Sequence, residues 1–90
     1  MNKERRKSLM ELVARIDEVQ SEINDIAEAL ESLKDEEQDY LDNMPENLQG
    51  SERYEKAEEA IGCLEEAYDT LQNMYDEASE VISGIEEACE

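Results

Sequence analysis

The 90-residue chain is long enough for one small domain and strongly acidic, with 27 Asp and Glu against 8 Lys and Arg and a formal net charge of -19. Charge repulsion at this level opposes binding to naked nucleic acid and to anionic membranes, so we expect a basic protein as the partner. Aromatic residues make up 4% and Trp and Phe are absent, so any core must be aliphatic and thin. Disordered chains share this composition, but disorder does not require the strict apolar repeat that both halves carry.

Residues 3–43 are predicted to form the first helix. Their apolar side chains recur in alternating steps of three and four, which is the a/d pattern of a coiled coil, and only Glu37 interrupts it. The predicted seam consists of Leu9, Leu12, Ile16, Val19, Ile23, Ile26, Leu30, Leu33 and Tyr40. The flanking columns are only patchily apolar, at Val13, Ala27 and Ala29. Gly and Pro are absent from this segment, so local propensity agrees with the pattern.

Residues 44–50 are predicted to form a turn with specific chemistry. Pro45 disfavours the α conformation at Met44 and should end the first helix just before it. The residues from Pro45 to Leu48 can form one helical turn, with Leu48 tucked against the end of the hairpin. Gly50 then frees the backbone before Ser51 caps the next helix.

The bend also carries a resemblance to known proteins. The stretch 42–53, DNMPENLQGSER, resembles the central part of small acidic helical proteins encoded by phages and mobile elements of Gram-positive bacteria. The resemblance covers about residues 35–66. These proteins are mostly uncharacterised, so it implies a phage-side origin and brings no assigned activity.

Residues 51–89 are predicted to form the second helix. The seam repeats without interruption through Tyr54, Ala57, Ile61, Leu64, Tyr68, Leu71, Tyr75, Ala78, Ile82, Ile85 and Cys89. A second apolar column recurs every seven residues beside it, at Ala60, Ala67, Met74, Val81 and Ala88. The resulting stripe is wider than one partner helix can cover, so this column is a candidate surface for a partner protein or a second copy.

The two seams match in one antiparallel register, in which the numbers of facing residues sum to 94. The expected layers include Leu33 on Ile61, Ile26 on Tyr68, Val19 on Tyr75, Leu12 on Ile82 and Leu9 on Ile85. The expected fold is therefore all-α, a long antiparallel two-helix coiled-coil hairpin that could pair into a four-helix dimer. This register brings the basic residues Arg5, Arg6 and Lys7 beside Glu86, Glu87 and Glu90. It also sets Glu37 against Ala57, near the open end, where the carboxylate can reach solvent.

The residue types expected of an enzyme are missing. Histidine is absent, and we find no Cys-x-x-Cys pair, phosphate-binding glycine loop or calcium loop. We therefore expect no catalysis, no cofactor and no metal. Cys63 and Cys89 lie roughly 39 Å apart along one helix, too far to form a disulfide within the chain. Free thiols, the lack of an apolar signal region and the lack of a membrane span predict the cytoplasm of a bacterial host.

Acidic residues dominate the second helix beyond Ala57, where no basic residue follows. The candidate partner-binding residues on this acidic face are Glu58, Glu59, Glu65, Glu66, Asp69, Asp76, Glu77 and Glu80. On a rod of about 60 Å the net charge amounts to one negative charge per ~3 Å, about half the linear charge density of duplex DNA.

Two functions follow from this charge and this shape. The first is an acidic protein–protein interaction module that mimics nucleic acid and occupies the basic groove of a DNA- or RNA-binding protein, such as a bacterial defence nuclease. The alternative is a coiled-coil scaffold or adaptor that acts as a homodimer. The alternative to the first function is that the acidic residues are only the solvated surface of the helix and bind no partner.

Overall fold

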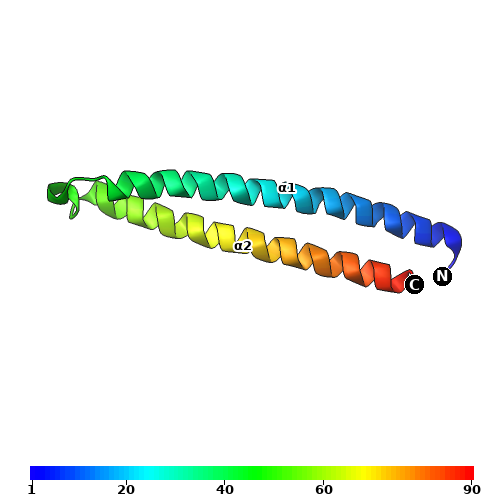
Figure 1. Ribbon diagram of the computed structural model, residues 1–90. Helices are drawn as coiled ribbons and strands as arrows, with labels where there is room; N and C mark the ends of the chain where they lie inside the picture. The colour runs from blue at the N-terminus through cyan, green and yellow to red at the C-terminus, as the bar shows by residue number, and fades with distance from the viewer.

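A computed structural model describes all residues 1–90 as two long antiparallel helices joined by a short bend (Figure 1). Helix α1 spans Lys3–Asp42, a 3-10 turn spans Glu46–Leu48, and helix α2 spans Glu52–Ala88. The molecule measures 70 × 15 × 14 Å. The all-α helical hairpin is confirmed, and each helix ends within one residue of its predicted boundary.

Side-chain caps explain where the helices begin and end. The side chain of Asn2 accepts a hydrogen bond from the Arg5 amide at 2.7 Å, and Ser51 accepts one from the Tyr54 amide at 3.3 Å. Both satisfy amides that the first helical turn leaves unpaired. At the end of α1, the Asn43 side chain donates to a carbonyl of the last turn at 2.8 Å. The predicted cap at Ser51 and the predicted helical turn after Pro45 are therefore both present.

The most closely packed part of the hairpin lies next to the bend. Leu41, Ala57 and Ile61 form one buried cluster, and Tyr54 packs against it. Met44 is also buried, whereas Leu48 is 40% exposed. The expectation that Leu48 tucks against the hairpin end is therefore wrong, because Met44 takes the inward position and the 3-10 turn carries Leu48 outward.

Helix α1 is rotated about its own axis relative to the predicted seam. One predicted column, Leu9, Ile16, Ile23 and Leu30, does face α2, but the other one does not. Its members Leu12, Val19, Ile26, Leu33 and Tyr40 are all 44–58% exposed. The positions one residue further along face inward instead, namely Val13, Gln20, Ala27, Lys34 and Leu41. With about 100° between successive residues, this exchange corresponds to a rotation of roughly 50°.

The rotation is accompanied by a shift along the helix axis. Leu41 and Ala57, which share one buried cluster, have numbers that sum to 98. The Gln20 side chain reaches Ser79 and Tyr75, with sums of 99 and 95. All of these sums exceed 94, and the buried Leu41 and Ala57 pair places the displacement of the register at about one helical turn.

The charged chain ends do not pair as predicted. The two ion pairs of the structure are Lys34 with Asp35 and Lys56 with Glu52, and neither joins the two ends. The start of α1 extends past the end of α2 (Figure 1), and no ion pair joins Arg5, Arg6 or Lys7 to the C-terminal carboxylates. Arg6 instead donates a hydrogen bond to the Met1 carbonyl at 3.2 Å.

Truncation at the bend should separate the inward leucine from the outward one. Leu41→Ala removes a side chain from the buried cluster and should lower the free energy of unfolding by about 2–3 kcal/mol. Leu48→Ala, at a 40% exposed position, should cost less than about 1 kcal/mol. Urea unfolding followed by circular dichroism at 222 nm measures both. Equal losses for the two variants would contradict the observed packing.

Candidate functional site

A continuous apolar strip runs along one side of the hairpin. We define the apolar strip as the exposed α1 column Leu12, Val19, Ile26, Leu33 and Tyr40, together with the α2 column Ala60, Ala67, Met74, Val81 and Ala88. Helical spacing places both columns on the same side, and two hollows on that side include members of the α1 column. One is lined by Leu12 and Val19 from α1 and Ile85 from α2. The other is lined by Tyr40 from α1 and by Arg53, which precedes Ala60 by seven residues in the α2 column.

The predicted apolar column of α2 is accessible in the hairpin. Ala67, Met74, Val81 and Ala88 are exposed and Ala60 is partly buried. Sequence reasoning missed the larger half of the strip, because the α1 column continues the seam pattern without a fault and was assigned to the core. Only the burial pattern distinguishes the two columns.

Charge is distributed unevenly around the hairpin. We call a set of six columns the strip zone. It comprises the two columns of the apolar strip, the seam column on the inner side of each, and the next column on the outer side of each. It contains four acidic residues, Glu22, Glu36, Glu37 and Glu77, and four basic residues, Arg5, Arg15, Arg53 and Lys56. Counted by these columns the strip zone is neutral, and the remaining 23 acidic and 4 basic residues carry the net charge of -19. Two of those acidic residues, Glu18 and Glu52, also line the hollows at the two ends of the strip.

The remaining sides of both helices form what we call the acidic side. All eight predicted partner-binding carboxylates on α2 are exposed. Helical spacing places seven of them on the acidic side, whereas Glu77 lies at the outer edge of the strip zone. From α1, Glu31 joins Glu65 and Asp69 around one shallow hollow on this side. The acidic face is therefore built by both helices, and not by α2 alone.

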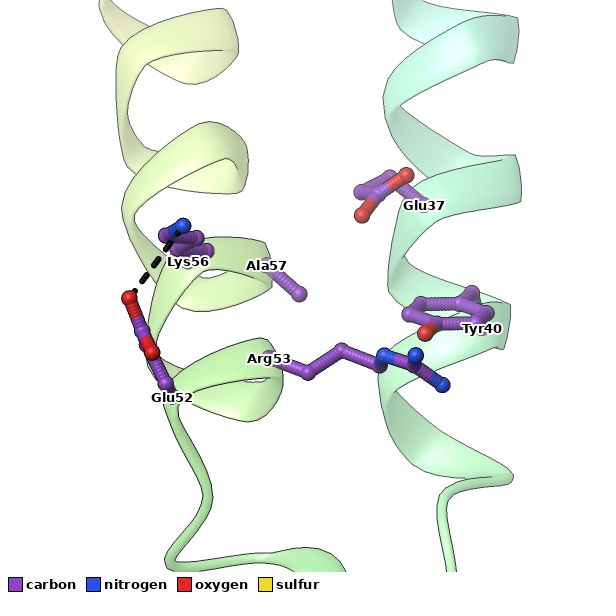
Figure 2. Close-up of a pocket in the computed structure, with 6 residues that line it drawn as sticks. All are labelled: Glu37, Tyr40, Glu52, Arg53, Lys56 and Ala57. Carbon is purple, nitrogen blue, oxygen red and sulfur yellow. Dashed lines mark ion pairs between the residues drawn. The ribbon is translucent and has the colours of Figure 1, made fainter.

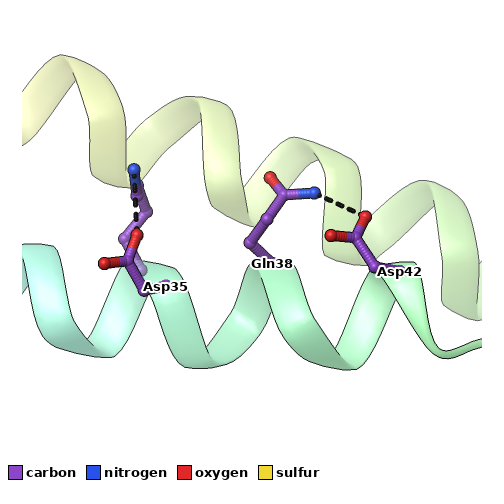
Figure 3. Close-up of polar contacts among 4 residues, drawn as sticks. Asp35, Gln38 and Asp42 are labelled. Atoms are coloured by element: carbon purple, nitrogen blue, oxygen red, sulfur yellow. Dashed lines mark hydrogen bonds and ion pairs between the residues drawn. The ribbon is translucent and has the colours of Figure 1, made fainter.

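Lys34 lies within this acidic surface and is one of its few basic groups. Its ammonium group is 3.3 Å from the Asp35 carboxylate (Figure 3). The side-chain contact with Asp35 raises the pKa of Lys34 above its usual value, and the charges of Glu65 and Glu31 add to this effect. Along the same edge of α1, Gln38 donates a hydrogen bond to Asp42 at 2.9 Å. Lys34 offsets part of the repulsion where the carboxylates of the two helices meet.

Tyr68 lies near the same carboxylates as Lys34. The negative charge of Glu31 raises the pKa of the Tyr68 hydroxyl, with desolvation and the more distant Asp69 and Glu28 adding to the shift. Ionisation would place a further negative charge among carboxylates, and the neutral phenol avoids this.

Gln20 is an inward-facing polar residue that the sequence pattern did not single out. It is buried, and its amide nitrogen donates to the Tyr75 carbonyl at 2.9 Å and to the Ser79 hydroxyl. No buried side-chain polar atom is left unpaired. Because an unpaired buried amide would be costly, these two bonds favour one rotational setting of α1 against α2.

A hollow close to the bend combines charges of both signs (Figure 2). Glu37 points from α1 toward α2, where Ala57 leaves room for it. Arg53 extends from α2 across to Tyr40, and Lys56 pairs with Glu52 at 3.3 Å. Glu37 lies at the bend end of the hairpin, and not near the open end as expected, but it is partly buried and so retains access to solvent. The charged residues of this hollow border the strip at its bend end.

The hairpin contains no disulfide, no metal-binding group of side chains and no helix suited to span a membrane. Both Cys63 and Cys89 are free thiols. No group of three or more Cys, Asp or Glu side chains is placed to hold a metal ion. Neither helix combines the length and the apolar character that crossing a membrane requires.

Comparison of the chain with known protein families, with curated proteins and with solved structures found no match in any of the three.

Removing the charge of Glu31 should lower the pKa of Tyr68. We expect Glu31→Gln to shift the pKa of Tyr68 toward the ordinary value of 10.0, and Glu28→Gln to shift it less. Ultraviolet absorbance of tyrosinate during a pH titration measures both shifts.

The raised pKa also sets a pH dependence of folding. Because Tyr68 ionises at higher pH in the folded chain than in the unfolded one, its contribution to folding stability is present below about pH 10 and declines as pH rises through the folded pKa. Glu31→Gln should weaken this decline. A titration curve that is identical in wild type and Glu31→Gln would contradict the assignment.

Proposed function

We propose that the chain is an acidic interaction module that mimics nucleic acid and inhibits a basic, nucleic-acid-binding protein by occupying its groove. The observation that carries this proposal is the concentration of the whole net charge outside the strip zone, along a straight rod 70 Å long. The resemblance of the bend to phage-encoded proteins makes a bacterial defence nuclease in the host cytoplasm the favoured target.

Charge spacing supports the proposal. A net charge of -19 over 70 Å averages about one negative charge per 4 Å, against one per ~1.7 Å in duplex DNA. The average understates the local density, because the strip zone contributes nothing to it. A rod 14–15 Å across can also enter a groove that accommodates a nucleic-acid strand or a slender duplex.

The field of such a rod would act before contact. Carboxylates at helical spacing along both helices create a negative potential over the full length of one side. Complementary potentials speed association and exclude wrong partners, and their effect falls with salt. Binding is therefore expected to be fast, salt-sensitive and competitive with nucleic acid.

Charge reversal on the acidic side provides the test. Glu58, Glu65, Glu66 and Asp69 are exposed on α2, so changing all four to Lys should leave the hairpin folded. Affinity capture from host cytoplasm should recover a basic nucleic-acid-binding protein with the wild type. The quadruple variant should bind that protein at least about 30-fold more weakly, since each lost surface charge pair contributes about 0.5–1 kcal/mol.

A graded control accompanies the reversal. Changing the same four residues to Gln and Asn removes half as much charge and should give an intermediate loss, together with a shallower dependence of affinity on salt. Addition of DNA or RNA should displace the captured protein from the wild type. Undiminished binding of the captured protein to the Lys variant would refute the mimicry.

A further inference from the structure

Five large apolar side chains on α1 are about half exposed in the hairpin. Leu12, Val19, Ile26, Leu33 and Tyr40 are between 44% and 58% exposed, and on α2 Met74 and Val81 are 44% and 51% exposed. At roughly 80 Å² each, these seven side chains leave about 560 Å² of apolar surface uncovered on one side. The largest apolar patch of a typical monomer is roughly 300–600 Å² and is often functional, so this surface lies at the upper end of that range.

We infer that a second copy of this chain covers the apolar strip, so that two hairpins form a four-helix bundle with their acidic sides outward. This assembly is independent of the proposed mimicry. It concerns the opposite surface, and its core is the α1 column that no contact within the chain explains.

Charge favours a second copy over a basic partner on this surface. The strip zone is neutral, with four acidic and four basic residues, although the chain as a whole carries -19. Two strips can therefore approach without net repulsion, while the acidic sides point away from each other. At physiological salt, charges separated by more than about 8 Å are largely screened.

The uncovered area also matches a dimer. Two copies would bury about 1,100 Å² from the seven large side chains alone, and the alanines and flanking residues add to this. Specific interfaces bury at least roughly 1,000–1,200 Å² in total. The 70 Å length of the hairpin spreads this contact over the whole molecule.

The sizes of the two columns fix the arrangement. The α1 column is bulky, whereas three of the five residues in the α2 column are alanines. If both bends lie at the same end, a two-fold axis along the rod sets the α1 column of one copy on the α2 column of the other. In the register of the hairpin, Leu33 is level with a point between Ala60 and Ala67, so a large side chain meets two small ones.

The same interleaving continues along the rod. Ile26 falls between Ala67 and Met74, whereas the smaller Val19 falls between the larger Met74 and Val81. Bulk on one helix is thus matched by space on the other, as close packing requires. Ridges on one helix entering gaps on another is the usual packing of antiparallel helical bundles.

Sedimentation equilibrium tests the assembly. The wild-type chain of 10.4 kDa should sediment at twice this mass at micromolar concentration. Ile26→Glu combined with Leu33→Glu should give the monomer mass, because four carboxylates cannot be buried together at the interface. Both positions are exposed in the hairpin, so circular dichroism should still show a helical chain.

The matched control adds the same two charges on the acidic side of α1. Asn24→Glu combined with Ser32→Glu should leave the mass doubled. A wild type that stays monomeric, or the same mass for both double variants, overturns the inference. Capture of a different protein by a monomeric wild type, with loss of that protein in the Ile26/Leu33 variant, would assign the strip to that protein and likewise overturn it.

Cysteine cross-linking tests the arrangement, with Cys63 and Cys89 changed to Ser. A mixture of the Leu33→Cys and Ala67→Cys chains should form a mixed disulfide dimer on oxidation. Bends at opposite ends would instead place Ile26 near Ile26 of the other copy. Cross-linking of an Ile26→Cys chain with itself, without the mixed dimer, would overturn the same-end arrangement.

Discussion

The structure depends on which side of α1 faces α2. Helix α1 has one uninterrupted apolar column and, beside it, a column in which Gln20 and Lys34 replace apolar residues. Hydrophobic burial alone favours the first column in the seam. The hairpin uses the second, and its polar members each find specific partners. Gln20 donates to the Tyr75 carbonyl and to Ser79, and Lys34 sits among Asp35, Glu65 and Glu31. This choice sets the register, exposes the apolar strip, and places one of the few basic residues where the acidic sides of the helices meet.

The same choice separates the molecule into two surfaces with different physical roles. The strip zone is neutral and carries the large uncovered side chains, whereas the acidic side carries the entire net charge. A two-helix hairpin has a thin core, with 8 of 90 residues buried and none of the large side chains fully enclosed. Association through the strip would thicken this core without burying carboxylates. A four-helix bundle formed in this way would still present acid along its outer sides, so homodimerisation and nucleic-acid mimicry are compatible in one assembly.

The sequence was sufficient to predict the helical hairpin, the helix boundaries, the Ser51 cap and the α2 seam apart from Tyr75, which is 37% exposed. Each of these follows from local periodicity or turn chemistry. It was not sufficient to predict which side of α1 faces α2. Two apolar columns compete there, and the periodic pattern cannot weigh the hydrogen bonds of Gln20, whose partners Tyr75 and Ser79 lie 55 and 59 positions away. The prediction for Leu48 was wrong for the same reason, since periodicity does not say whether Leu48 or Met44 turns inward at the bend. For the candidate surfaces, the acidic residues were identified from composition, but the larger half of the apolar strip was assigned to the core.

Intramolecular disulfide formation tests the setting of α1 most directly. In a chain with Cys63 and Cys89 changed to Ser, Leu41→Cys with Ala57→Cys joins two members of the buried cluster, whereas Tyr40→Cys with Tyr54→Cys joins a layer of the register that sums to 94. Mass spectrometry of the oxidised monomer, compared with its reduced form, gives the yield of each disulfide. The account predicts rapid, nearly complete closure of the 41–57 pair and little closure of the 40–54 pair. Preferential closure of the 40–54 pair would return Leu12, Val19, Ile26 and Leu33 to the seam and contradict both the observed register and the apolar strip.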